Sequence, residues 1–191
     1  LQAPDMYMDK IAIGSNLPLN IIDLDLDVEN NIKSLAEAKK VKVSDLTACL
    51  LNRPRHSKII KSLNEMNVNI KFISDGDVTG VISVGYPEKK IDIYLGLGGA
   101  PEGVLAAAAL KCLGCQMQGR LHFLEKHEED KAKKLGINDL NKKYDINDMV
   151  KDDVIFCATG VTDGDFVKGI KYDSDTFFSE TKYSNVKIIE D

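Results

Sequence analysis

The sequence has no long apolar run, no excess of basic residues and few cysteines, and each shortage excludes a class of protein. A helix that spans a bilayer takes about 18 or more consecutive apolar residues, and no run approaches that length. No charged-then-apolar leader stands at the start, so we expect a soluble protein that is not exported and works in the cytoplasm. The net charge of −5 argues against a nucleic-acid surface, which needs clustered Lys and Arg.

The four cysteines are too few for a disulfide scaffold and fit a reducing compartment. Cys112 and Cys115 form a lone CxxC without a second pair or a histidine pair, which favours a structural role over zinc or redox chemistry. The chain begins at "LQAPDMYMDK", without Met and without an evident strand or helix, and reads as a sequence entered partway through. Its 191 residues, 43% of them hydrophobic, suffice for one large domain or for one and a half small ones.

Apolar runs alternate with helical patterns along most of the chain, which is typical of an α/β fold. The patterns predict buried strands at 46–51, 68–73 and 90–98, and a further buried strand that opens the segment 152–170. They predict helices at 57–67 (with Ser57 as N-cap), 78–85, 101–113 and 124–136. Residues 143–150 look irregular, and 176–191 look like an edge hairpin.

Three predicted strands run directly into polar loops, namely "NRPRH" (52–56), "SDGDVTG" (74–80) and "GLGGAPEG" (96–103). Ligands of open α/β sheets bind beyond the carboxyl ends of the strands. We therefore expect the three loops to line one crevice, although each loop alone also fits an ordinary turn.

The loops carry side chains suited to a phosphorylated ligand. Arg53 and Arg55 flank a proline, and they are either two guanidinium groups that grip phosphate or carboxylate oxygens or two surface arginines beside a helix start. Asp75 and Asp77 either hold a divalent cation or accept hydrogen bonds from hydroxyl groups, and the lack of further oxygen ligands nearby favours hydroxyls. Glu102, in the first turn of its helix, either stabilises the helix start or holds a metal ion that bridges to a phosphoryl oxygen.

Five segments carry a more specific pattern: "APDMYMDK" (3–10), "RPRH" (53–56), "SDGDV" (74–78), "GLGGAPEGVLAAAALKCLGCQMQGRL" (96–121) and "IFCATGVTDGDFVKGI" (155–170). In this order they resemble the class II fructose-1,6-bisphosphatases. That resemblance implies the lithium-sensitive, metal-dependent phosphatase superfamily and an α/β fold. The fold would be a layered α-β-α sandwich of the inositol-monophosphatase-like, sugar-phosphatase type, here lacking its N-terminal part. Residues 1–191 would be the substrate-binding and C-terminal portion of a single phosphatase unit, without a separate domain boundary.

The resemblance also implies an activity and a site. The activity is hydrolysis of fructose 1,6-bisphosphate to fructose 6-phosphate and phosphate in gluconeogenesis, with two or more Mn²⁺ or Mg²⁺ ions activating water. Glu102 would be a metal ligand, and Gly99 would touch the substrate beside it. Tyr7, Arg53 and Arg55 would hold the distal 6-phosphate. The sugar hydroxyls would be held by Asp75, Gly76 and Asp77.

The same resemblance places the catalytic residues and the other metal carboxylates upstream of Leu1, so these 191 residues alone are expected to be inactive. The expected partners are the substrate, the missing N-terminal segment and further copies in a dimer or tetramer. Two alternatives stay open. One is a sedoheptulose 1,7-bisphosphatase or an enzyme with both activities, and the other is a non-catalytic sugar-phosphate-binding module. Glu102 argues against a non-catalytic binding module, because a carboxylate beside a phosphate needs a metal ion between them.

Overall fold

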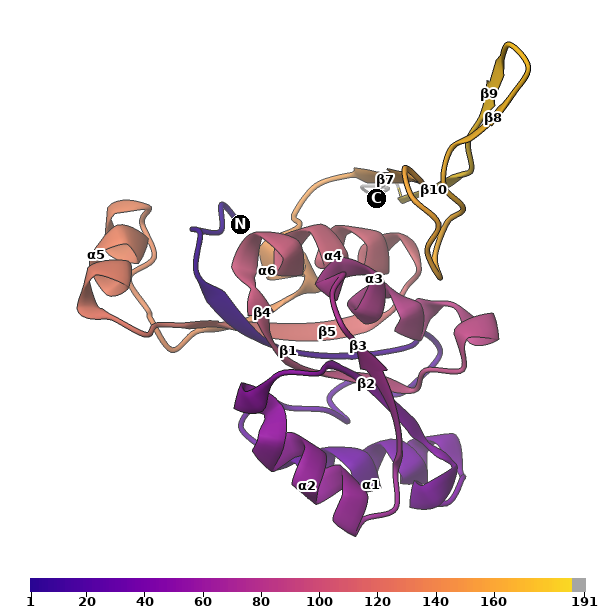
Figure 1. The fold of residues 1–191 in the computed structure, drawn as a ribbon. Helices are drawn as coiled ribbons and strands as arrows, with labels where there is room; N and C mark the ends of the chain where they lie inside the picture. Colours follow the sequence, from indigo (N-terminus) through magenta and orange to yellow (C-terminus); the bar gives the residue numbers. More distant parts are fainter. Residues whose placement is uncertain (187–191) are drawn as a thin grey trace, which may run out of the picture.

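A computed structural model of the chain describes residues 1–186 and builds them around a six-stranded mixed sheet (Figure 1). The strand order is β3-β2-β4-β1-β5-β6. The bounds are β1 (Tyr7–Ile13), β2 (Thr47–Leu51), β3 (Asn69–Ile73), β4 (Ile93–Gly99), β5 (Gln116–His122) and β6 (Lys143–Asp145). Strand β2 runs parallel to β3 and β4, whereas β1 is antiparallel to both β4 and β5.

Helices cover both faces of this sheet (Figure 1). Helices α1 (Val28–Lys39) and α2 (Ser57–Glu65) pack on one face, and α3 (Asp77–Ile82), α4 (Ala100–Cys112) and α6 (Ile146–Met149) pack on the other. Helix α5 (Lys126–Lys134) lies to one side of the sheet, beyond the end of β5. The expected α/β fold is thus confirmed.

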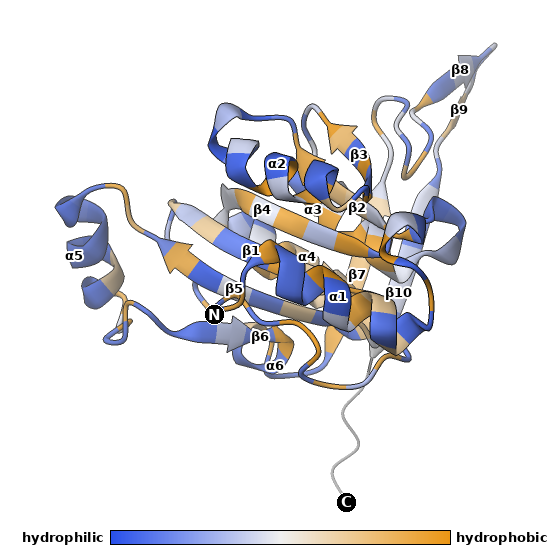
Figure 2. Ribbon diagram, turned by 90° about the horizontal axis from the view of Figure 1, so that it is seen from below, coloured by the Kyte–Doolittle hydropathy of each residue, from blue (hydrophilic) through white to orange (hydrophobic). Residues whose placement is uncertain are grey.

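The apolar sequence of β4 follows from this double coverage. Ile93, Tyr94 and Leu95 are consecutive and all buried, because one side chain faces α1 and α2 while the next faces α3 and α4. Figure 2 shows apolar segments along the strands of the sheet, between the helices. Alanines of α4, among them Ala106 and Ala107, have no exposed surface, since this helix lies between the sheet and a further layer.

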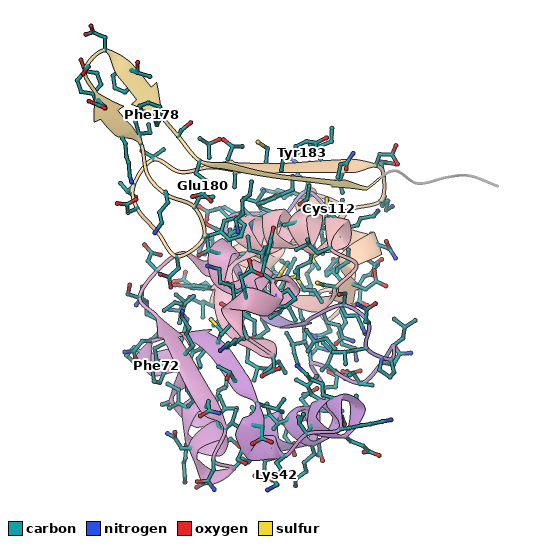
Figure 3. The ribbon with its side chains drawn as sticks, turned by 90° about the vertical axis from the view of Figure 1, so that its right-hand side faces the viewer. Lys42, Phe72, Cys112, Phe178, Glu180 and Tyr183 are labelled. Carbon is teal, nitrogen blue, oxygen red and sulfur yellow. The ribbon has the colours of Figure 1, made fainter. Side chains whose placement is uncertain are left out.

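That further layer is a ribbon of β7 (Val154–Thr159) and β10 (Thr181–Val186), which pair antiparallel over α4. Cys112 of α4 lies beneath this ribbon in Figure 3, with its thiol 3.8 Å from the carbonyl oxygen of Val154. A second ribbon, β8 (Lys171–Asp173) with β9 (Thr176–Phe178), projects away from the body. None of the helices in the described part of the chain combines the length and the apolar character that a bilayer span requires.

The strands predicted at 46–51, 68–73 and 90–98 and the helices predicted at 57–67, 78–85, 101–113 and 124–136 are confirmed, with shifted ends. The burial predicted for 68–73 is wrong, because β3 is an edge strand of the sheet and Phe72 is 45% exposed. Ser57 does not cap α2, because the helix begins at Ser57 itself and His56 precedes it in a 3₁₀ turn. No loop separates β4 from α4, since the strand runs to Gly99 and the helix begins at Ala100.

Other predictions about the fold were wrong. Residues 143–150 are not irregular: they form β6 and α6, and the Asp145 carboxylate caps α6 by accepting the amide hydrogen of Asp148 at 2.7 Å. Strand β7 is not buried, because among the described strands it pairs only with β10, and Ile155 is 67% exposed. The expected hairpin at 176–191 is divided, since β9 pairs with β8 and β10 with β7, and residues 187–191 lie outside the described part.

Candidate active site

The carboxyl ends of β2, β3 and β4 and the amino end of β1 meet at one edge of the sheet, because β1 runs antiparallel to β4. Tyr7, the first residue of β1, is therefore paired with Gly99, the last residue of β4. A pocket of about 290 Å³ opens at this edge. Its walls are Tyr7, Leu51, Arg53, Arg55, Asp75, Gly76, Asp77, Val78, Gly98, Gly99 and Glu102.

All eight residues that the sequence predicts for the site line this one pocket. They come from four separate segments of the chain, namely the start of β1, the loops or helix starts that follow β2 and β3, and the junction of β4 with α4. The expected crevice is therefore present as a cavity, and the ligand contacts assigned to its residues stay predictions.

The two arginines are fixed by backbone carbonyl groups. Arg53 donates to the carbonyl oxygens of Asn52, at 3.1 Å, and of Ser74, at 2.6 Å. Arg55 donates its Nε hydrogen to the carbonyl oxygen of Leu97 at 3.0 Å, and its guanidinium carbon lies 5.1 Å from the centre of the Tyr7 ring. The Nε contact leaves both terminal nitrogens of Arg55 for a ligand, and their fork matches two phosphate oxygens.

The turn after β3 presents its two carboxylates differently. Gly76 has a φ of 79°, a left-handed conformation that glycine adopts without steric cost. Asp75 is exposed, and its Oδ1 accepts only the amide hydrogen of Gly76, at 2.9 Å, among the described contacts. Asp77 is held from behind, because its two oxygens accept hydrogen bonds from the ammonium group of Lys10 and the hydroxyl of Tyr94.

Lys10 also belongs to this site, although the sequence motifs assign it no role. Its side chain has no exposed surface, and besides Asp77 it binds the carbonyl oxygen of Gly99 at 2.9 Å. Burial lowers the pKa of the Lys10 ammonium group, and the nearby Asp77 carboxylate opposes that shift. Burial, together with Asp77, raises the pKa of the Tyr94 hydroxyl, so it stays a hydrogen-bond donor at neutral pH.

A lysine within an otherwise apolar run such as "KIAIG" is the signal that could have revealed this network. Lysine is almost never fully buried unless it is paired, so its presence there predicts an acid from another part of the chain. Lys10, Asp77 and Tyr94 thus form a polar network behind the wall of the pocket that Asp77 provides.

Glu102 stands in the first turn of α4, and the glycines before that helix leave room for carboxylates. A Cβ at Gly98 would overlap the Asp77 carboxylate, and a Cβ at Gly99 would overlap the carboxylate of Glu102. Glycine is therefore required at positions 98 and 99 by the close approach of two acids to the backbone.

The described residues contain no group of three or more His, Cys, Asp or Glu side chains arranged to hold a metal ion. Glu102 therefore fits the predicted role only as one ligand among several, because Mg²⁺ takes six oxygen ligands in near-octahedral geometry. Further oxygen ligands would have to complete the coordination of such an ion.

The CxxC pair lies at the far end of α4 from Glu102. Burial raises the pKa of the Cys115 thiol to about 11, so this thiol is protonated at neutral pH and is a poor nucleophile. That state agrees with the structural role that the sequence favours for the pair.

Comparison with known proteins relates most of the chain to one enzyme family. The family model described as bacterial fructose-1,6-bisphosphatase, glpX-encoded, matches residues 1–187. The class 2 fructose-1,6-bisphosphatase of Haemophilus influenzae is 39% identical over 194 residues, which cover 95% of this chain and 58% of that protein.

Two proteins of Synechococcus, from strains JA-2-3B'a(2-13) and JA-3-3Ab, are 36% and 37% identical over 185 residues. Both are named D-fructose 1,6-bisphosphatase class 2/sedoheptulose 1,7-bisphosphatase, and the matched region covers 90% of this chain and 53% of each relative. The chain thus spans little more than half the length of the curated relatives it matches.

Proposed function

This chain belongs to the bacterial, glpX-encoded fructose-1,6-bisphosphatase family, and from that premise we propose that the whole protein hydrolyses fructose 1,6-bisphosphate to fructose 6-phosphate and phosphate, as in gluconeogenesis. One observation supports this most: eight residues from four segments line a single pocket that combines guanidinium groups with carboxylates. The chain would supply the substrate-binding half of a layered α-β-α sandwich of the sugar-phosphatase type.

In this proposal Arg53, Arg55 and Tyr7 hold the distal 6-phosphate. The guanidinium groups already have fixed positions, because backbone carbonyls bind both terminal nitrogens of Arg53 and the Nε of Arg55. A phosphate grip of this kind acts equally in the ground state and the transition state, so it contributes binding energy and orientation rather than turnover.

The carboxylates bind the sugar hydroxyls and the part of the substrate near the 1-phosphate, which is hydrolysed. Asp75 and Asp77 accept hydrogen bonds from sugar hydroxyls, and Lys10 with Tyr94 keeps Asp77 in place. Glu102 would repel a phosphate directly, so its place in the pocket is explained by a divalent ion, Mn²⁺ or Mg²⁺, between the two. When bound, two or more such ions supply an activated water and neutralise charge on the transferring phosphoryl group.

A second candidate activity is hydrolysis of sedoheptulose 1,7-bisphosphate, which the names of the two Synechococcus relatives favour. Both substrates are ketose bisphosphates, and the loops around the pocket contain no feature that separates them. The cytoplasm and a homo-oligomer, dimer or tetramer, remain the expected location and state.

The test is a phosphate-release assay on the full-length protein with four substrates: fructose 1,6-bisphosphate, sedoheptulose 1,7-bisphosphate, fructose 1-phosphate and fructose 6-phosphate. We expect hydrolysis of fructose 1,6-bisphosphate at carbon 1, no hydrolysis of fructose 6-phosphate, loss of activity with a chelator and recovery with Mn²⁺ or Mg²⁺. Binding of the bisphosphate without metal-dependent release of phosphate would instead indicate a sugar-phosphate-binding module.

A further inference from the structure

His56 is a buried side chain whose two ring nitrogens are both bonded, and none of the predicted roles uses it. The residue is only 1% exposed. Its Nδ1 lies 2.7 Å from the carbonyl oxygen of Leu51, and its Nε2 lies 2.9 Å from the amide nitrogen of Leu97. Because a carbonyl oxygen only accepts and a backbone N–H only donates, the neutral ring with its proton on Nδ1 satisfies both contacts.

The imidazole ring bridges the ends of two strands that have separated. The pairing of β2 with β4 covers Ala48 with Ile93 and Cys49 with Tyr94, and the described register goes no further. Beyond Tyr94, β4 stays paired with β1 on one side, and on the other side, side chains of the turn after β2 take the place of a strand. His56 accepts the amide hydrogen of Leu97, and Arg55 donates to the carbonyl oxygen of the same residue.

Gly96 leaves the space that the ring occupies. A Cβ at this position would lie 3.1 Å from both Cε1 and Nε2 of His56, which is tighter than ordinary van der Waals contact. The φ of 151° at Gly96 is also one that residues with a side chain rarely adopt. The first glycine of "GLGGAPEG" therefore accommodates the imidazole ring, as Gly98 and Gly99 accommodate carboxylates.

We infer that His56 is a positioning residue for the distal phosphate, and that it acts through Leu97 on Arg55. The imidazole ring fixes the amide of Leu97, the carbonyl of Leu97 fixes Nε of Arg55, and the ring of Tyr7 supports the guanidinium group 5.1 Å away. The inference rests on the proposed function, because it takes Arg55 to be a ligand of the 6-phosphate. Loss of the Leu97 contact should therefore weaken substrate binding and leave the chemical step unchanged.

Two substitutions in the full-length protein separate the two contacts of the ring. The amide group of asparagine reaches about as far as Nδ1, and that of glutamine about as far as Nε2. His56→Asn keeps a donor for Leu51 and loses the acceptor for Leu97, whereas His56→Gln keeps the acceptor. We expect His56→Asn to raise KM for fructose 1,6-bisphosphate about tenfold with kcat within about twofold, and His56→Gln to stay within about threefold of the wild-type KM.

Three controls distinguish positioning from general damage. KM for fructose 1-phosphate, which has no distal phosphate, should not change in His56→Asn. Leu63→Ala, a cavity variant in the buried face of the neighbouring α2, should lower stability without raising KM. In an Arg55→Lys background, which removes the Nε donor but keeps the charge, His56→Asn should cause no further increase in KM.

Additive effects of His56→Asn and Arg55→Lys on KM, or an unchanged KM in His56→Asn, would overturn the inference while the bisphosphatase activity of the wild type stood. An inactive wild-type protein would instead refute the proposed function. Should His56→Asn not fold, ¹⁵N NMR of the wild-type imidazole at neutral pH decides the matter. The neutral Nδ1–H tautomer is expected, and a protonated ring or the Nε2–H tautomer would overturn the inference.

Discussion

Removing the charge of Lys10 should destabilise the protein far more than removing a surface charge. The Lys10 side chain has no exposed surface, and Lys10→Met keeps its length while removing the donors to Asp77 and to the carbonyl oxygen of Gly99. Breaking a buried ion pair from one side costs about 3–5 kcal/mol, because the other charge is left without its partner. Asp77 keeps the Tyr94 hydroxyl and 10% exposure to the pocket, so we expect the lower end, about 3 kcal/mol.

Urea unfolding of the purified protein measures this difference, and thermal unfolding should show a Tm lower by roughly 6–12 °C for a chain of this size. Lys39→Met is the matched control, since Lys39 pairs with Asp92 but is one-third exposed, and its loss should cost at most about 1 kcal/mol. Adding Asp77→Asn to Lys10→Met should recover part of the stability, because no unpaired charge remains. Equal losses in Lys10→Met and Lys39→Met would refute the reasoning.

Three further predictions concern the pocket, the fragment and the buried thiols. In the full-length enzyme, Arg55→Ala should raise KM for the bisphosphate about 10- to 150-fold, the equivalent of a lost charged hydrogen bond, with little change in kcat. A collapse of kcat at constant KM would contradict that role. Residues 1–191 alone should release no phosphate with any divalent metal, because Glu102, the one carboxylate proposed as a metal ligand, cannot hold two ions by itself. Robust hydrolysis by this fragment would show that the catalytic centre lies within these residues, contrary to the account. Burial raises the pKa of Cys49 and Cys115 to about 11, so their contribution to stability is complete below pH 9 and is lost between about pH 9 and 11, where the unfolded thiols ionise first. The unfolding free energy should therefore fall less between pH 8 and 10.5 in Cys115→Ala than in the wild type, and identical slopes would contradict the assigned cause.

The sequence predicts the parts of the fold that local patterns encode. Strands β2, β3 and β4 are predictable because each is an apolar run bounded by turn residues. Strand β1, at the centre of the sheet, is not predicted, because Asp9 and Lys10 interrupt its apolar pattern. Lys10 is tolerated there only through its pairing with Asp77, 67 positions along the chain, and no local pattern encodes such a pairing.

The same distinction between local patterns and long-range contacts applies to the residues of the site. Residues that face the pocket carry recognisable chemistry in their loops, so their gathering could be expected from the strand order that α/β folds favour. Tyr94 and His56 work from behind the pocket walls, through contacts with Asp77 and Leu97. His56 belongs to the motif "RPRH", yet nothing in that motif indicates which strand its ring would meet.

The most direct test of the account is the rate of phosphate release from fructose 1,6-bisphosphate by full-length Glu102→Gln. This change keeps the shape of the side chain and removes its charge, so it removes an ionic ligand of the metal that Glu102 is proposed to bind. Glu88→Gln is the control, since Glu88 is 61% exposed at its side chain and lies outside the pocket. The account predicts a folded Glu102→Gln protein with almost no turnover and a Glu88→Gln protein with wild-type turnover. A near-normal rate of Glu102→Gln at saturating Mn²⁺ would contradict it.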